Sequence, residues 1–147
     1  KELGTRSQKE LVELCLHLSK FKKENKELLT YLLYEADNEA AYIENIKIEI
    51  DEQFEEINTS RFYFIKKSVR KILRGTKKYI RYSKQKETQI ELMLYFCQKL
   101  KAFRPSIHKN IPLLNLYQRE REGIRKTIAG LHEDLQYDYQ ILLEELK

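Results

Sequence analysis

The chain has 147 residues and a formal net charge of +5, and 41% of its residues are apolar while 35% are charged. It contains only four Gly and two Pro, too few punctuating residues for a turn-rich all-β fold. The ample, periodic apolar content also excludes a disordered chain, and the length predicts a single helical domain over residues 1–147.

The ends and the cysteines indicate the compartment. No apolar run approaches the roughly 20 residues of a transmembrane helix, and the N-terminal residues lack the apolar core of a signal peptide. Because the chain begins with Lys1 rather than Met, we expect it to be trimmed or part of a longer chain. Cys15 and Cys97 have apolar neighbours, so we expect two buried free thiols, with a disulfide between them as the alternative. Two cysteines without an export signal favour the cytoplasm.

The first 57 residues are expected to form two helices, because their apolar residues recur at steps of three and four. The first helix should begin after Thr5 or Ser7, since Ser7 and Glu10 have the spacing of a capping box. The second helix should cover about 26–57. If it breaks, the break should fall at Asp37 and Asn38, which favour caps and turns.

Three further helices are expected after this region. Two of them cover about 61–82 and 86–103, and Gly75 inside the first should mark a kink or a close helix contact. Two prolines bracket a predicted loop over 104–112, and one last helix runs from Pro112 to the C-terminal end. The pattern predicts an all-α antiparallel bundle of about five long helices, with an irregular stack of α-hairpins as the alternative.

Charge is distributed very unevenly along the chain. Residues 1–59 hold 14 acids and 8 bases, residues 60–86 hold 11 bases and no acid, and residues 87–147 hold nine of each. An acidic helix is therefore followed by a wholly basic one. In an antiparallel hairpin Asp51 and Glu52 would lie near Lys66 and Lys67, and Glu44 near Arg74, so internal neutralisation is one interpretation of the basic helix.

The other interpretation is an anion-binding surface, because a basic stripe with interleaved aromatic residues is typical of nucleic-acid binders. Cations would hold phosphates while a tyrosine stacks on an unpaired base. Tyr82 is the better stacking candidate, because Tyr79 falls on the apolar stripe. The candidate residues are Lys67, Arg70, Lys71, Arg74, Lys77, Lys78, Arg81, Tyr82 and Lys84.

A second pattern lies near the C-terminal end. Arg125 and His132 are separated by six residues, and positions seven apart on a helix share a face. The pair resembles the motif of HEPN-type ribonucleases, helical proteins in which a histidine follows an arginine after four to six residues. The resemblance implies that both side chains converge on an RNA phosphate. It covers eight residues, and Lys126 departs from the polar amide or acid that follows the arginine in that family.

These observations lead to an ordered set of expectations. We expect first a non-catalytic helical interaction or structural module, second a nucleic-acid binder acting through residues 61–86, and third a HEPN-like ribonuclease. The last helix is the expected contact element for a protein partner or for self-association, because Tyr137, Tyr139 and the residues around Ile141 give it apolar residues on more than one side. We expect no metal, cofactor or small-molecule ligand, since metal-ligand spacings and phosphate-binding loops are absent from the sequence.

Overall fold

The computed structural model describes residues 1–146 and confirms the all-α fold class. Within that range 82% helix, seven α-helices and no strand are found. The chain divides into two compact units, the first over residues 1–38 and the second from residue 39 onward. The expected single domain stays a prediction.

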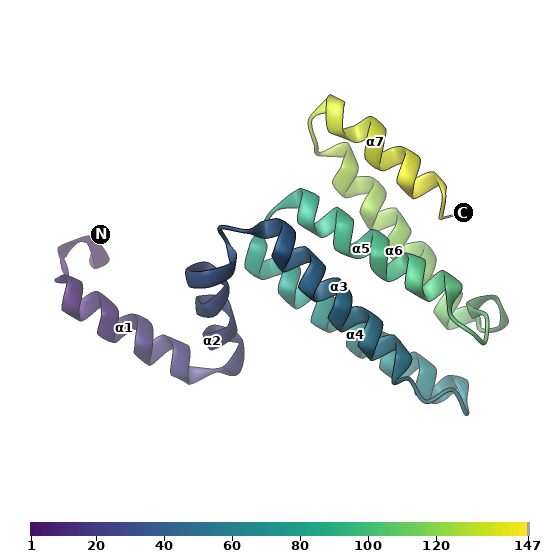
Figure 1. Ribbon diagram of the computed structural model, residues 1–147, viewed down its shortest axis with the longest axis horizontal. Coiled ribbons are helices and arrows are strands. Elements are labelled where there is room, and N and C mark those ends of the chain that lie inside the picture. The colour runs from purple at the N-terminus through teal and green to yellow at the C-terminus, as the bar shows by residue number, and fades with distance from the viewer. Residues whose placement is uncertain (147) are drawn as a thin grey trace. The chain divides into compact units, whose positions relative to one another are not determined.

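The first unit consists of short helices (Figure 1). A 3₁₀ turn, η1 (Leu3–Thr5), precedes α1 (Gln8–Phe21), α2 (Lys23–Thr30) and a π-helical segment, η2 (Tyr31–Glu35). The predicted capping box is present, because Glu10 N donates to Ser7 Oγ at 3.2 Å and Ser7 N donates to Glu10 Oε1 at 3.1 Å. The start of the first helix is therefore confirmed.

The single helix predicted over 26–57 is wrong, and the alternative of a break at Asp37 and Asn38 is confirmed. Its first part ends with η2, and α3 (Glu39–Glu55) begins a new helix in the second unit. The interruption falls at Asp37 and Asn38, where Asn38 N donates to Glu35 O at 3.0 Å. Their preference for turns therefore prevails over the apolar period that continues on both sides.

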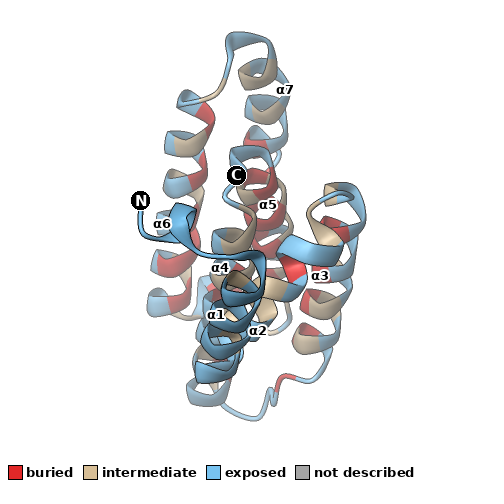
Figure 2. Ribbon diagram, turned by 90° about the vertical axis from the view of Figure 1, so that its left-hand side faces the viewer, coloured by how far each residue is buried: buried red, intermediate tan, exposed pale blue. Residues whose placement is uncertain are grey.

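The second unit is arranged around one central helix. It contains α3, α4 (Phe62–Ser83), α5 (Lys86–Ala102), a 3₁₀ turn η3 (Ile107–Lys109), α6 (Ile111–Ala129) and α7 (Glu133–Glu144). Helix α5 packs against α3 and α4 on one side and against α6 and α7 on the other (Figure 1). Buried positions are concentrated in this unit, as Figure 2 shows. Those of α5 are Thr88, Ile90, Leu92, Met93, Leu94, Phe96, Cys97 and Leu100.

Helices α4 and α5 are joined by a turn without glycine. Lys84 adopts the left-handed conformation at φ 59° and ψ 7°, and its N–H donates to Ile80 O at 3.0 Å. This bond closes the last turn of α4 and lets α5 reverse direction within two residues. The predicted boundaries of both helices agree with the structure to within a residue or so.

The single last helix predicted from Pro112 is wrong. Helix α6 ends at Ala129, Gly130 caps it, and His132 starts α7 by accepting a hydrogen bond from Asp134 N at 3.3 Å. A glycine followed by the acidic first turn Glu133 and Asp134 is a helix stop and start signal. The apolar steps from Ile128 to Leu135 concealed it, because they continue across the break.

Gly75 does not mark a close helix contact, so that part of the expectation is wrong. Helix α4 runs without interruption from Phe62 to Ser83, and a Cβ on Gly75 would meet nothing within 4 Å.

Gly75→Ala is therefore expected to raise the free energy of unfolding by up to about 1 kcal/mol, because alanine loses less backbone freedom in a helix. Urea denaturation at constant slope measures the change. Gly130→Ala is the matched control, since its Cβ would lie 3.0 Å from Lys86 Nζ, and no gain is expected there. A loss of stability in Gly75→Ala would contradict the open environment of this position.

The two cysteines differ in exposure. Both are free, but Cys15 is exposed whereas Cys97 is buried, so the expectation of two buried thiols is wrong for Cys15. Burial raises the pKa of the Cys97 thiol to about 12, with smaller effects of opposite sign from Glu120 and Arg121.

We expect a thiol reagent at pH 8 to modify one of the two cysteines in dilute native protein and both in denaturant. Cys15 is accessible, whereas Cys97 is shielded and stays protonated. Absorbance of the released thiol anion counts the reacted groups. Two groups reacting at one rate in native protein would contradict the burial of Cys97.

Candidate nucleic-acid interface

Helix α4 has a sharply divided surface. The side that faces α3 and α5 is buried and carries Ile65, Val69, Ile72, Leu73 and Thr76. Even the hydroxyl of Thr76 is internally bonded, donating to Ile72 O at 2.9 Å. Since one side of the helix is fixed in the core, its polar residues are held on the opposite side.

Six of the predicted site residues form an exposed cationic stripe. Within residues 1–146 their side chains make no hydrogen bond or ion pair, and no acid occurs between residues 60 and 86 to neutralise them locally. Those on α4 extend from Lys67 to Arg81, about 21 Å at 1.5 Å per residue, and the sixth, Lys84, lies in the turn that ends the helix. We call this surface the basic face; it consists of Lys67, Arg70, Lys71, Arg74, Arg81 and Lys84.

Two other predicted cations are engaged within the protein. Lys77 Nζ lies 2.6 Å from Oε1 of Glu120, a carboxylate on α6 whose side chain is only 8% exposed. Lys78 Nζ lies 4.9 Å from the centre of the Tyr79 ring. Along α4 these two residues lie between Arg74 and Arg81, and Lys77 in addition joins α4 to α6.

None of the predicted ion pairs between the acids of α3 and the bases of α4 is formed. Asp51 pairs with Lys99 of α5 at 3.2 Å and accepts a hydrogen bond from Tyr95 Oη at 2.5 Å. Glu44 pairs with Lys47 on its own helix at 3.7 Å. In the described chain, 1–146, Lys66, Lys67 and Arg74 form no ion pair, so the acids expected near them do not neutralise them through such pairs.

The hydrogen bond to Asp51 has a consequence for Tyr95. Desolvation raises the pKa of Tyr95 to about 12, and Asp51 adds to the shift by accepting the phenolic proton and by its charge. Asp51 is thus held between Tyr95 and Lys99 on the α5 side of α3, which keeps its charge away from the basic face.

The aromatic residues of α4 are placed differently from what the sequence indicates. Tyr82 is half-buried and packs edge-on against Tyr79, with ring centres 6.1 Å apart. The exposed ring on the side of the basic face is Tyr63, which is 63% exposed and precedes Lys67 by four positions and Arg70 by seven. The spacing in the sequence could have found Tyr63, but its distance from the centre of the basic run concealed it.

The geometric basis of the ribonuclease hypothesis is absent. Because α6 ends at Ala129, Arg125 and His132 do not share a helix face. Arg125 pairs with Glu122 at 3.2 Å, and His132 is an exposed helix cap. Ribonuclease activity stays a prediction without this support.

The described residues, 1–146, contain neither a candidate metal cluster nor a membrane-spanning helix. In this range no three His, Cys, Asp or Glu side chains are grouped so that they could hold a metal ion. Nor does any described helix combine the length and the apolar character needed to cross a membrane.

Comparisons with known proteins add no relative. No family model, no curated protein and no solved structure matches this chain.

Proposed function

We propose that this chain is a non-catalytic helical module that binds nucleic acid through the basic face of α4. The observation that carries the proposal is that five exposed cations on α4, together with Lys84 at its C-terminal cap, have no internal partner in residues 1–146. A surface that is neutralised inside the protein would have little to offer a polyanion. This one keeps its charge available for phosphates.

The binding energy would come mainly from counterion release. Each phosphate that a lysine or arginine neutralises frees condensed cations from the nucleic acid, so affinity falls as salt rises. The cations are distributed along a straight helix, which suits a backbone that runs parallel to it. Lys and Arg contacts of this kind position the ligand without reading its sequence.

Tyr63 favours single strands over duplexes. Its exposed ring lies at one end of the stripe, where an unpaired base could stack on it while Lys67 and Arg70 hold the neighbouring phosphates. Stacking of one base on an aromatic ring contributes about 1–3 kcal/mol. A duplex would keep its bases stacked on each other and could not use the ring.

The test compares two variants with equal charge. One replaces Lys67, Lys71, Arg74 and Arg81 with glutamine, and the control makes the same change at four exposed cations outside α4. These control positions are Lys9, Lys109, Arg119 and Lys126. Glutamine is a good helix former and all positions are exposed, so both variants should keep the helical circular dichroism of the parent.

We expect the α4 variant to bind a fluorescent single-stranded oligonucleotide about 100-fold more weakly at low salt, while the control loses little, because phosphate contacts dominate such affinities. Tyr63→Leu should weaken single-strand binding and leave duplex binding unchanged. Equal losses in the two charge variants would overturn the basic face as the site. Binding only to anionic lipid vesicles would overturn nucleic acid as the ligand.

A further inference from the structure

A small pocket opens between α4, α5 and α6 in the second unit. It has a volume of about 100 Å³. Its apolar lining comes from Ile90, Met93 and Ile124, which are all buried, and its charged lining from Lys77 and Glu120. The side chain of Lys77 is 48% exposed and that of Glu120 is 8% exposed, so Lys77 lies at the mouth of the pocket and Glu120 deeper in it.

The ion pair between these two residues leaves hydrogen-bonding capacity unused. Lys77 Nζ donates to Glu120 Oε1 at 2.6 Å, but within residues 1–146 the second carboxylate oxygen, Oε2, accepts no hydrogen bond. An ammonium group has three N–H donors, and inside the described chain Lys77 uses one of them. A buried acceptor without a partner is costly. The pocket therefore presents a carboxylate acceptor directly beside ammonium donors.

The other two polar side chains of the pocket are bonded within the protein. Gln89 Nε2 donates to Thr127 Oγ1 at 3.3 Å, and this hydroxyl donates in turn to Gly123 O at 3.0 Å. Recognition of a ligand in this pocket therefore depends mainly on Lys77 and Glu120.

We propose that this pocket receives the edge of one unpaired pyrimidine base, an inference that rests on the nucleic-acid binding proposed above. The pairing edge of a pyrimidine carries a donor next to an acceptor: N4–H beside N3 in cytosine, and N3–H beside O2 in thymine and uracil. The donor would bond to Glu120 Oε2 and the acceptor to Lys77 Nζ. Single strands are read in this way, by hydrogen bonds to base edges that pairing would otherwise occupy.

The size of the pocket suits a single ring. A water molecule needs about 10–15 Å³ of such a cavity, so the pocket has room for a group of several heavy atoms. A pyrimidine is such a group, and the larger purines fit less well. The buried side chains of Ile90, Met93 and Ile124 would contact the ring, while its polar edge reaches the ion pair.

The basic face continues past the mouth of the pocket. Arg74 lies three positions before Lys77 and Arg81 four positions after it, and residues at these spacings share one side of a helix. Both are exposed members of the basic face. They can hold the phosphates on either side of a nucleotide whose base enters the pocket, so one strand would use the basic face and the pocket together.

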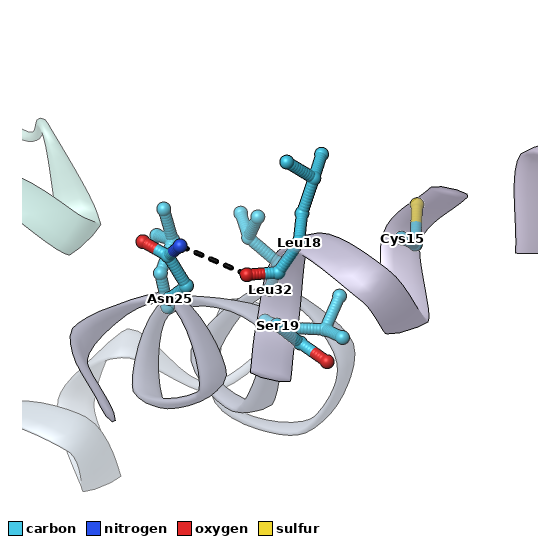
Figure 3. A pocket seen from close by; sticks show the side chains of 7 residues that line it. Cys15, Leu18, Ser19, Asn25 and Leu32 are labelled. Carbon is cyan, nitrogen blue, oxygen red and sulfur yellow. Dashed lines mark hydrogen bonds between the residues drawn. The ribbon is translucent and has the colours of Figure 1, made fainter. Parts of the chain in front are cut away.

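A larger groove in the first unit lacks such a recognition element. It has a volume of about 280 Å³, its walls are mostly leucine side chains, and none of its lining residues is charged. Asn25 Nδ2 donates to Leu18 O at 2.8 Å and joins its two walls (Figure 3). The pocket at Lys77 and Glu120 is therefore the better candidate for a site that selects its ligand.

Gly123→Leu tests the pocket without breaking the ion pair. Gly123 lines the pocket, and a Cβ at this position would meet nothing within 4 Å, so a leucine can fill the space that the base would occupy. Leucine is also the better helix former, and the helical circular dichroism should be kept. The matched control is Ala129→Leu, which adds an apolar side chain at an exposed position of α6 outside the pocket.

The two ligands are a thymine oligonucleotide and the same oligonucleotide with N3-methylthymine, which has equal charge but lacks the N3–H donor. We expect the parent and Ala129→Leu to bind the methylated strand about 10-fold more weakly at low salt, since a matched pair of hydrogen bonds to a base discriminates by about this factor. Gly123→Leu should bind both strands equally, at the weaker affinity.

The outcomes separate this inference from the proposed function. Equal binding of both strands by the parent, with affinity that still falls as salt rises, would overturn the base pocket and leave the basic face in place. A methyl effect that persists in Gly123→Leu would overturn the pocket as the position of the base. No binding of either strand by the parent at low salt would overturn both proposals.

Discussion

Phe96→Ala is expected to lower the free energy of unfolding by about 3–5 kcal/mol, the range for deleting a large buried aromatic side chain. Phe96 has no exposed surface and lies on α5, the helix that packs against four others. Its ring is 5.8 Å from that of Phe54 on α3, tilted by 51°, so the substitution removes both apolar burial and an aromatic pair.

The measurement is urea denaturation, with unfolding monitored by circular dichroism. The midpoint should fall while the slope stays the same, because the surface exposed on unfolding hardly changes. Tyr137→Ala is the control, since this aromatic side chain is 67% exposed, and it should cost less than about 0.5 kcal/mol. If both substitutions cost the same, α5 would not be the centre of the core.

Lys77→Met is expected to lower the free energy of unfolding by about 1–3 kcal/mol, because it leaves the buried carboxylate of Glu120 without its partner. The two groups are 2.6 Å apart, and Glu120 is among the few buried polar side chains of the described chain. A charge in such a place is costly when it is unpaired, although the half-exposed position of Lys77 keeps the effect below that of a fully buried pair.

The double variant Lys77→Met with Glu120→Leu should recover most of the loss, since it removes both charges and leaves apolar groups in their place. Arg125→Met is the control, because it breaks the exposed pair with Glu122, which contributes at most about 1 kcal/mol. Additive losses in the double variant would show that the Lys77–Glu120 contact contributes nothing of its own.

The helical periodicity of the sequence was enough to predict the fold class and most helix starts. It failed where the apolar steps continue through an interruption. Ile128, Leu131 and Leu135 keep the spacing of one helix, although Gly130 and His132 divide it. The signal that ends the helix consists of a few residues around Gly130, whereas the apolar periodicity extends over many residues on both sides of it. The periodicity therefore dominated the prediction.

The candidate site was predicted in part for a similar reason. Periodicity places Lys67, Arg70 and Arg74 on one side of a helix, and the structure finds them exposed there. It does not reveal which helix lies next to which, so the pairing of Lys77 with Glu120, 43 positions away, could not be foreseen. The same holds for Asp51, whose partner Lys99 lies on α5 rather than on α4.

The sequence also did not predict how exposed individual side chains are. Tyr82 and Tyr63 both belong to α4, and only tertiary packing against Tyr79 decides that the first is half-buried. Cys15 has the apolar neighbours of a core residue, yet no other helix in its own unit covers it. A pattern shows what a face could bury, not whether a partner is present.

The salt dependence of single-strand binding tests the central claim most directly. If the six cations of the basic face neutralise phosphates, the logarithm of the association constant should fall linearly with the logarithm of the salt concentration, with a slope of about −4. The glutamine variant at Lys67, Lys71, Arg74 and Arg81 should reduce that slope to about −1 to −2, because two contacts remain. An affinity that ignores salt, or a slope that the variant leaves unchanged, would contradict the account.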